Sequence, residues 1–293
     1  MDDILITVLT PTYNRGQLLV NAFNSLLRQT SHNFEWIVVD DGSIDNTCNI
    51  VNSFSTDLFK IKYIKKENGG KHTAINYGVC FASGYLTLIL DSDDFLSNDC
   101  IEFIEKHVDE IRHEDFAGLS GLRGYANSNT PIGMCGGNKK YIDATNIQRR
   151  RKKLLGDKAE AYKTDILKKF PFPVYDGEVF LSENAVWDQI ALAGYKLRWF
   201  NKIIYYGEYL DGGLTKNLGD DVFLKNFNGY TYCFCVALKW EKGLRRLWLI
   251  ANYQRIARKK GFLDKELIKL INVNYCELLI SRVLLKVRSA IKG

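Results

Sequence analysis

LTLILDSDD, at residues 86–94, is the stretch of sequence that decides the fold. Its first five residues form an apolar run with the length and leucine-rich, β-branched composition of a strand buried on both faces. Three carboxylates then follow within four residues, and ligands of open α/β sheets bind at this carboxyl edge. Because clustered like charges are unfavourable unless a cation neutralises them, the stretch predicts a divalent-metal site on such a sheet. An acidic turn that caps the next helix is the alternative.

The first half of the chain alternates strand and helix patterns. Strands are predicted at residues 4–9, 35–39, 61–64 and 85–90, and helices at residues 17–29, 46–54 and 71–82. The first strand is expected to stop at Thr10-Pro11. A further helix, capped by Ser97 or Asn98, has the apolar face Ile101, Ile104, Val108 and Ile111. Strands that alternate with short helices predict an α/β fold with a doubly wound, mainly parallel sheet flanked by helices.

Composition excludes several classes of protein. The 293 residues, 46% hydrophobic and 13% aromatic, exclude disorder and allow one large domain or two intimate lobes. Seven cysteines without a Cys-x-x-Cys spacing predict reduced, buried thiols instead of disulfides or a zinc site. Neither a signal peptide nor an apolar run of roughly 20 residues is found. We therefore expect a cytoplasmic protein, with peripheral attachment to the inner face of the cell membrane as an alternative.

Positive charge is concentrated at the C-terminal end of the chain. Residues 239–293 contain 14 Lys and Arg against 4 Asp and Glu, a net charge of +10, so residues 1–238 carry −4. A second basic run occupies residues 149–153. Since no known nucleic-acid-binding pattern accompanies these charges, nucleic acid is not expected as a partner. A solvated helix face and an anionic membrane surface both fit them.

Chemically distinctive groups follow each predicted strand. They are Tyr13 and Asn14 after the first strand, Asp40 and Asp41 after the second, Asn68-Gly69-Gly70-Lys71 after the third, and Asp91, Asp93 and Asp94 after the fourth. The full P-loop and dinucleotide-binding glycine patterns are absent, which excludes P-loop NTPases and Rossmann dehydrogenases. An Asp after the second strand can accept the imino N–H of a pyrimidine, with Tyr13 stacked on the base. A metal at Asp91 and Asp93 can bridge a diphosphate, although each signal alone also fits a turn or a helix cap.

Together these motifs resemble the inverting family 2 glycosyltransferases of GT-A fold. The resemblance rests on TPTYNR at residues 10–15, VVDDGSxDxT at residues 38–47, NGG at residues 68–70 and LDSDD at residues 90–94, and covers roughly the first 110 residues. It implies a metal-dependent glycosyltransferase of hexosyltransferase type, as in bacterial polysaccharide biosynthesis. Such an enzyme moves a sugar from a nucleotide diphosphate sugar to a hydroxyl of a glycan or lipid-linked acceptor.

The resemblance also implies roles for individual residues. The nucleotide pocket would include Pro11, Tyr13, Asn14, Asp41, Asn68, Gly70, Lys71, Asp91 and Ser92. Asp41 would recognise the base. Asp93 would bind Mg²⁺ or Mn²⁺, the metals that hard oxygen ligands favour, with Asp91 near the ribose or in the metal shell. Asp94 is expected to order the turn.

The second half of the chain resembles the family less closely. Family members usually offer an acidic residue, often a Glu-Asp pair, at the start of a helix as the general base. The nearest match is ENAVWD at residues 183–188, where the pair is missing. Glu183 precedes a helix predicted at residues 184–193, whose N-terminus would keep its carboxylate ionised. Glu183 is therefore the preferred base, and Asp188, inside the same helix, is the alternative.

Three further features of the second half allow two interpretations each. Residues 206–215 predict a strand and a loop that closes over the donor diphosphate or acceptor, or a plain turn. Trp187 and Trp199 are expected in the core, with sugar stacking as the alternative. On a helical wheel, residues 277–292 separate an apolar side, which includes Leu279, Ile280 and Val283, from a basic side. Such a helix lies on an anionic membrane or packs its apolar side on the catalytic domain.

The resemblance divides the chain into three parts. Residues 1–115 would form the nucleotide-sugar-binding half of the GT-A domain, residues 116–218 its acceptor-binding half, and residues 219–293 a basic helical extension. Two other functions remain open. A nucleotidyltransferase would normally carry a glycine-rich loop with Arg and Lys where this chain has PTYNR. A non-catalytic nucleotide- or glycan-binding module stays open because the acidic pair is missing.

Overall fold

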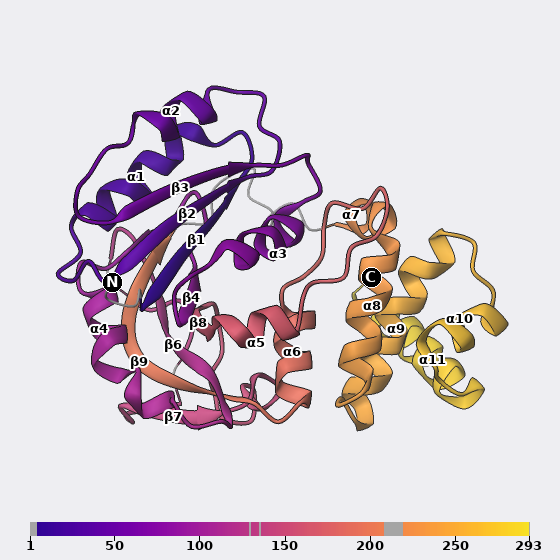
Figure 1. Cartoon of the computed structure of the whole chain (residues 1–293). Coiled ribbons are helices and arrows are strands. Elements are labelled where there is room, and N and C mark those ends of the chain that lie inside the picture. The colour runs from indigo at the N-terminus through magenta and orange to yellow at the C-terminus, as the bar shows by residue number, and fades with distance from the viewer. Residues whose placement is uncertain (1–4, 129, 135, 208–218, 293) are drawn as a thin grey trace. The chain divides into compact units, whose positions relative to one another are not determined.

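The computed structural model describes residues 5–128, 130–134, 136–207 and 219–292, with backbone alone for residues 286–292, and separates into two compact units (Figure 1). Unit 1 consists of the described residues within 1–172 and 190–209. Unit 2 consists of those within 173–189 and 210–293. Unit 2 thus combines a short internal segment with the C-terminal helices. The three-part division from sequence stays a prediction.

Unit 1 contains a nine-stranded mixed sheet. Strands β1 (Ile6–Thr12), β2 (Phe34–Asp40), β3 (Lys60–Lys65) and β4 (Leu86–Ile89) are parallel, in the order β3-β2-β1-β4. The sheet continues through β8 (Lys158–Lys163), β6 (Phe116–Tyr125), β9 (Lys196–Gly207) and β5 (Phe95–Leu96), and β7 (Tyr141–Ala144) pairs with β9. The strand order reverses between β1 and β4, and ligands of such sheets bind beyond the carboxyl ends at this point. The predicted α/β class is confirmed.

Helices cover both faces of the parallel strands. They are α1 (Gly16–Leu27), α2 (Thr47–Ser53), α3 (Lys71–Phe81), α4 (Cys100–His107) and α5 (Thr164–Lys169). Figure 1 shows α1 and α2 on one side of β1–β3 and α3 on the other. On the α1 side, Phe23 stacks on Trp36, with 5.9 Å between ring centroids. On the α3 side, a Cβ at Gly78 would lie 2.3 Å from Leu9 Cδ1, so glycine permits this close approach of helix and strand.

Strand β1 continues beyond its predicted end, through Pro11 to Thr12. The prediction failed because only one edge of the strand is paired there. The Leu9 carbonyl accepts a bond from Leu90 on the β4 side, and the Thr12 carbonyl accepts one from Asp41 on the β2 side. Backbone groups alternate along a strand, so the Pro11 nitrogen faces the β4 side, where pairing has ended. A missing N–H is therefore tolerated at this position.

Helix α4 begins one residue later than its predicted caps allow. Its N-cap is Asp99, without a capping side-chain bond, so the assignment of the cap to Ser97 or Asn98 was wrong. Ser97 acts instead through its backbone carbonyl, which accepts the Cys100 N–H at 3.1 Å. The 3₁₀ turns η1 (Asp109–Ile111) and η2 (Asn146–Gln148) lie further along the chain. The predicted apolar face is confirmed, because Ile101, Ile104, Val108 and Ile111 are all buried.

Unit 2 is helical. It contains the first part of α6 (Asn184–Leu192), and α7 (Asp220–Lys225), α8 (Phe227–Leu238), α9 (Gly243–Lys259), α10 (Asp264–Ile271) and α11 (Tyr275–Lys292). Its core includes Phe227, Ile250, Tyr253, Ile256, Leu267 and Leu278. Across the described residues, none of the helices is both long and apolar enough to cross a membrane.

Helix α11 packs within unit 2 through a face that the helical wheel did not predict. Leu278 and Ser281 are fully buried, whereas Leu279, Ile280 and Val283 are 39%, 50% and 58% exposed. The α9 residue Gln254 donates to Ser281 Oγ at 2.5 Å and to the Leu278 carbonyl at 3.0 Å. The contact with α9 therefore combines the apolar Leu278 with an amide and a hydroxyl, and packing of the apolar side on the catalytic domain stays a prediction.

The cysteines are free thiols, as expected, but most of them are not buried. All six described cysteines lack a disulfide partner. Cys100 is buried, while Cys80 and Cys276 are exposed and the other three are intermediate. Among the six described cysteines, the prediction of buried thiols is correct only for Cys100. An odd number and the lack of a Cys-x-x-Cys spacing argue against a disulfide framework, but they carry no information about which helix face a cysteine occupies.

Candidate functional site

The loop after β1 is joined to the loop after β2 by Asn14. This residue has a left-handed backbone, φ +52°, which Asn tolerates better than most residues. Its backbone N–H donates to Ser43 Oγ at 2.8 Å, and its side-chain oxygen accepts the Ile44 N–H at 2.8 Å. Asn14, predicted to bind nucleotide, thus also holds two strand-end loops together.

Asp41 forms the centre of the next loop contact. Its carboxylate accepts the backbone N–H groups of Gly69 at 3.0 Å and Gly70 at 2.7 Å, and bonds from Lys66 Nζ at 2.7 Å and Asn68 Nδ2 at 3.2 Å. The residue is only 3% exposed. The structure therefore brings three predicted nucleotide-binding residues, Asp41, Asn68 and Gly70, into direct contact. Lys66 is a partner that the sequence analysis missed.

The neighbouring Asp40 serves the turn. Its Oδ1 accepts the Ser43 N–H at 2.7 Å, and its Oδ2 accepts a bond from the Tyr63 hydroxyl. The bond to Ser43, three residues further along, closes the loop after β2, so the turn interpretation of this segment is confirmed for Asp40. Of the two adjacent aspartates, one shapes its own loop and the other binds the loop after β3.

Each of the three carboxylates after β4 faces a different cation. Lys71 Nζ lies 2.5 Å from Asp91 Oδ1, and Arg15 Nη1 lies 2.9 Å from Asp93 Oδ2. Arg123 Nη2 lies 3.0 Å from Asp94 Oδ1. The side chains of Asp91 and Asp93 are 32% and 15% exposed, whereas that of Asp94 is 1% exposed. Asp91 and Asp93 are therefore accessible to a ligand, and Asp94 is not.

The environment of these carboxylates drives their pKa values apart. Burial raises the pKa of Asp94 to about 7, and the negative charge of Asp91 adds to the effect. Burial also opposes ionisation of Asp91, but the ion pair with Lys71 outweighs it and lowers the pKa of that carboxyl. Near neutral pH, Asp91 is thus a carboxylate while Asp94 is partly protonated.

Tyr205 of β9 connects the two ends of this acidic turn. Its hydroxyl accepts the Asp91 N–H at 2.9 Å and donates to Asp94 Oδ2 at 2.8 Å. The Asp94 N–H in turn donates to the Asp91 carbonyl at 3.1 Å. These bonds support the predicted turn-ordering role of Asp94. Tyr205 and Arg123 of β6 were missed because nothing near them in the sequence signals a partner on β4.

The oxygen donors after β4 suit a divalent cation that arrives with a diphosphate. In the described part of the chain, no three His, Cys, Asp or Glu side chains are grouped to hold a metal. The accessible carboxylates of Asp91 and Asp93 are the two groups there that can face a ligand, and a metal site at them stays a prediction. Mg²⁺ in proteins is commonly held in this way, by one or two carboxylates, substrate phosphates and water.

The remaining predicted nucleotide-binding residues differ in accessibility. Tyr13 is 46% exposed, so its side chain is accessible to a ligand. Pro11 and Ser92 are buried. Lys71 contacts Asp91 from the first turn of α3. The nucleotide roles of all these residues stay predictions.

The two candidate bases lie in unit 2, apart in sequence from the unit 1 residues above. Glu183 directly precedes α6, and its carbonyl accepts the N–H groups of Val186 at 3.0 Å and Trp187 at 3.1 Å. Asp188 is 9% exposed, and its Oδ2 accepts a bond from Trp240 Nε1 at 3.2 Å. Glu183 thus occupies the expected helix start, while Asp188 is buried and is bonded to Trp240.

Two other expectations concern the second half of the chain. Trp187 and Trp199 are 4% and 1% exposed, and Trp199 Nε1 donates to the Ala144 carbonyl at 2.8 Å. The core-packing interpretation is therefore confirmed for both. Strand β9 ends at Gly207. The rest of the strand and loop predicted at residues 206–215 lies outside the described residues.

Comparison with known families identifies this arrangement of strand-end motifs. The family described as "Glycosyl transferase family 2" matches residues 7–167, more than half of the chain. The chain belongs to glycosyl transferase family 2. The matched range contains every motif after β1–β4 and ends before Glu183. The predicted family is thus confirmed, while the residue roles in the second half have no support from this match.

Individual family 2 relatives are similar over about a third of the chain. Glycosyltransferase GlyG of Streptococcus pneumoniae is 39% identical over 107 residues, 36% of either chain. Chondroitin synthase of Pasteurella multocida is 35% identical over 102 residues, which are 35% of this chain and 11% of the synthase. The chain therefore spans about a third of the length of GlyG and about a tenth of that of the synthase.

Solved structures share the fold of the family 2 chain over nearly its whole length. S. aureus TarS 1–349 in complex with UDP-GlcNAc has a TM-score of 0.63 at 19% identity, covering 94% of this chain and 79% of that one. A mannosyltransferase from Pyrobaculum calidifontis with GDP-Man and Mn²⁺ has a TM-score of 0.56 at 17% identity, covering 98% and 79%. At such identities the likeness shows the GT-A fold alone.

Proposed function

We propose that this family 2 chain is a metal-dependent, inverting glycosyltransferase. It would transfer a sugar from a nucleotide diphosphate sugar to a hydroxyl of a glycan or lipid-linked saccharide. The observation that carries the proposal is the pair of accessible carboxylates after β4, Asp91 and Asp93, each neutralised by a long, flexible cationic side chain. The two carboxylates can bind a metal in place of the Lys71 and Arg15 side chains. Those two side chains are then available to bind phosphate.

The donor would bind along the loops after β1, β2 and β3. The exposed Tyr13 ring offers a stacking surface for the base. Asp41 already accepts four donors, about as many as a carboxylate can accept, so a base N–H must displace one of them. The Lys66 or Asn68 side chain is the natural one to leave, because the two glycine N–H groups are fixed in the backbone.

The diphosphate would bind beside Asp91 and Asp93. A bound Mg²⁺ or Mn²⁺ supplies positive charge that stabilises the departing nucleotide diphosphate. Arg15 and Lys71, once released from their carboxylates, are placed to donate charge-assisted hydrogen bonds to phosphate oxygens. Tyr205 holds the acidic turn in a fixed geometry through the Asp91 N–H and the Asp94 carboxyl.

The acceptor hydroxyl would be activated by an acidic residue at or near the start of α6. Glu183 is proposed to take the proton from the acceptor hydroxyl, because it directly precedes α6, where the resemblance places the general base. Attack from the face opposite the leaving diphosphate inverts the anomeric carbon. Asp188 is the alternative base, and its bond from Trp240 makes it the weaker candidate. Positioning of both substrates would supply much of the remaining rate.

Named relatives support the substrate class without choosing a substrate. TarS was solved with UDP and with UDP-GlcNAc, and the mannosyltransferase with GDP-Man and Mn²⁺. The relatives also include chondroitin and hyaluronan synthases. A nucleotide sugar is bound in one TarS structure and in the mannosyltransferase, a divalent cation is named for the mannosyltransferase, and the nucleotide and the sugar differ between the two proteins.

The proposal is tested by incubating the full chain with single UDP- and GDP-sugars, Mn²⁺ or Mg²⁺, and oligosaccharide or lipid-linked acceptors. We expect release of the nucleoside diphosphate with one donor, dependent on the metal and increased by the acceptor. Release of pyrophosphate from a nucleoside triphosphate and a sugar phosphate would instead identify a nucleotidyltransferase. Thermal stabilisation by a nucleotide sugar without turnover with any acceptor would indicate a binding module.

A further inference from the structure

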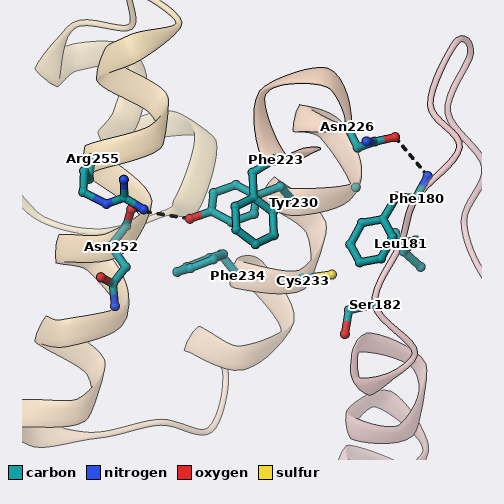
Figure 2. Close-up of a pocket in the computed structure, with 11 residues that line it drawn as sticks. Phe180, Leu181, Ser182, Phe223, Asn226, Tyr230, Cys233, Phe234, Asn252 and Arg255 are labelled. Atoms are coloured by element: carbon teal, nitrogen blue, oxygen red, sulfur yellow. Dashed lines mark hydrogen bonds between the residues drawn. The ribbon is translucent and has the colours of Figure 1, made fainter. Parts of the chain in front are cut away.

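Unit 2 contains a pocket that none of the proposed donor or base residues lines (Figure 2). Its volume is about 320 Å³, near the lower end of the range of small-ligand sites, roughly 300–1,000 Å³. The walls come from the segment before α6 and from helices α7, α8 and α9. Four aromatic rings and Leu181 dominate the lining, as Figure 2 shows; the rings are those of Phe180, Phe223, Tyr230 and Phe234.

Hydrogen bonds fix the wall that precedes α6. The Glu178 carboxylate accepts the N–H groups of Asn228 at 2.7 Å and Gly229 at 2.8 Å, in the first turn of α8. The Asn226 side-chain oxygen accepts the N–H groups of Val179 at 2.8 Å and Phe180 at 2.9 Å. The segment and the helix are thus held together from both sides. The pocket is preformed, which lowers the entropic penalty of binding.

Polar groups of the lining are mostly engaged with the protein. Asn226 uses its oxygen for two backbone N–H groups and donates Nδ2 to the Val222 carbonyl at 2.8 Å. The Tyr230 hydroxyl donates to the Asn252 carbonyl at 3.4 Å. A sugar would bury several hydroxyls against aromatic walls with few partners, and each unpaired hydroxyl is unfavourable. The lining therefore favours an apolar ligand.

The rim of the pocket carries excess positive charge. Arg255, one of the lining residues, is exposed and pairs with Asp220. Lys259, one turn further along α9, lies 2.6 Å from the same Asp220 oxygen. Two cations thus share the Asp220 carboxylate, so these three groups together carry one excess positive charge. An anionic group at the mouth would be attracted, and Arg255 is suited to phosphate geometry.

We propose that this pocket binds one short apolar chain, of the isoprenoid or alkyl kind, whose phosphate head group lies at Arg255 and Lys259. The enclosed volume suits a single chain instead of a bilayer surface. Binding at this pocket does not depend on the proposed glycosyltransferase function. Its use as the anchor of a lipid-linked acceptor rests on that function, since Ser182 of the pocket directly precedes the proposed base Glu183.

The direct test is calorimetric titration of the full chain, without nucleotide sugar, with five probes, one of which is N-acetylglucosamine. Geranyl phosphate and dodecyl phosphate should bind, and the tighter one distinguishes an isoprenoid from an alkyl source. Geraniol should bind more weakly, and inorganic phosphate should not bind measurably. Saturable binding of N-acetylglucosamine in place of the amphiphiles, or no binding of either phosphate ester, would overturn the proposal. Because no turnover is measured, the result is independent of the glycosyltransferase assay.

Matched variants locate the site. Cys233→Phe should fill the cavity and weaken geranyl phosphate by about tenfold or more, whereas Cys276→Phe, on the exposed face of α11, should not. Arg255→Gln should weaken geranyl phosphate but not geraniol. Its control is Arg245→Gln, which removes another α9 cation paired with a carboxylate, Glu241. Equal binding by Cys233→Phe and the native chain would exclude this pocket.

One measurement avoids the risk that a cavity-filling variant fails to fold. A thiol reagent should modify Cys233 slowly in the native chain, because burial raises the pKa of this thiol to about 11. Geranyl phosphate should slow modification of Cys233 further and leave that of the exposed Cys276 unchanged, as read by mass spectrometry. Unchanged protection of Cys233 at saturating geranyl phosphate would contradict the proposal.

Discussion

The loops after β2 and β4 both present aspartates at the carboxyl edge of the sheet, but they neutralise them differently. Asp41, 3% exposed, is held by two backbone N–H groups, an amide and one lysine. Asp91 and Asp93 are partly exposed and are each paired with a long cationic side chain. Fixed donors make a carboxylate part of the architecture, whereas a flexible cation can leave when a ligand arrives. The same residue type therefore serves two purposes at one edge.

The largest expected effect is on kcat and concerns Glu183, which belongs to neither of these two loops. Glu183→Gln keeps the shape of the side chain but removes its capacity to accept a proton. We expect kcat to fall by roughly 10²–10⁴-fold while donor affinity stays nearly unchanged. Asp188→Asn, the matched variant five residues further along, should have a smaller effect. Steady-state kinetics that gave the reverse order would move the role of base to Asp188.

The loop after β4, whose carboxylates are paired with flexible cationic side chains, is tested by Asp93→Asn. Loss of this carboxylate should lower kcat by roughly 10²-fold or more and weaken metal-dependent donor binding, because an electrostatic contact to the diphosphate site is removed. The free energy of unfolding should stay close to that of the native chain. The exposed Asp57→Asn serves as a control for loss of one negative charge on unit 1. Near-normal, metal-dependent turnover of Asp93→Asn would refute the assignment.

The loop after β2, whose carboxylate is held by fixed donors, is tested by the same type of substitution, Asp41→Asn. Asp41→Asn leaves buried N–H groups and Lys66 Nζ without a carboxylate, so the free energy of unfolding should fall by about 1–3 kcal/mol. Urea unfolding of both variants checks the contrast, since Asp93→Asn should not show this loss. If Asp41→Asn were as stable as the native chain, the distinction between fixed and exchangeable neutralisation would not hold.

A pH-dependent effect is expected from Asp94. Its pKa is about 7 in the folded chain against an ordinary value of 3.8, so the folded state binds more protons between these values. Stability should therefore decrease as pH rises from about 4 to about 7, with a slope from this group of at most about 1.4 kcal/mol per pH unit. Asp94→Asn should lack this contribution in urea unfolding at pH 5, 6 and 7. An identical slope in both proteins would show that Asp94 titrates normally.

The smallest expected effect concerns the exposed residues of α11. Ile280 and Val283 are half exposed or more on a helix rich in basic residues. If this face lies on an anionic membrane, the Ile280→Glu/Val283→Glu variant should partition onto anionic vesicles about three- to tenfold less than the native chain. Leu263→Glu, at an equally exposed position outside α11, is the control in co-sedimentation. No partitioning by the native chain would rule out the membrane role.

Sequence predictions were accurate for features set by neighbouring residues and failed for features set by contacts between residues distant in sequence. Predictions for the elements before Asp94 were accurate to within a few residues, because alternating apolar runs and their bounding polar residues are local signals. The end of β1 was misjudged because a proline is tolerated at position 11 only where β1 no longer pairs with β4. The face through which α11 contacts α9 was not predicted, because Gln254 and Ser281 form a polar helix contact that hydrophobicity does not reveal.

By itself, the sequence determined that Asp41, Asp91 and Asp93 share one edge of a sheet, because parallel strands joined by helices must end on the same side. Only the tertiary structure decided how each charge is neutralised. Lys66 and Lys71 lie on the third connection, Arg15 on the first, and Arg123 and Tyr205 on strands β6 and β9. Ion pairing depends on distances of a few ångströms between side chains far apart in the chain, which no local pattern specifies.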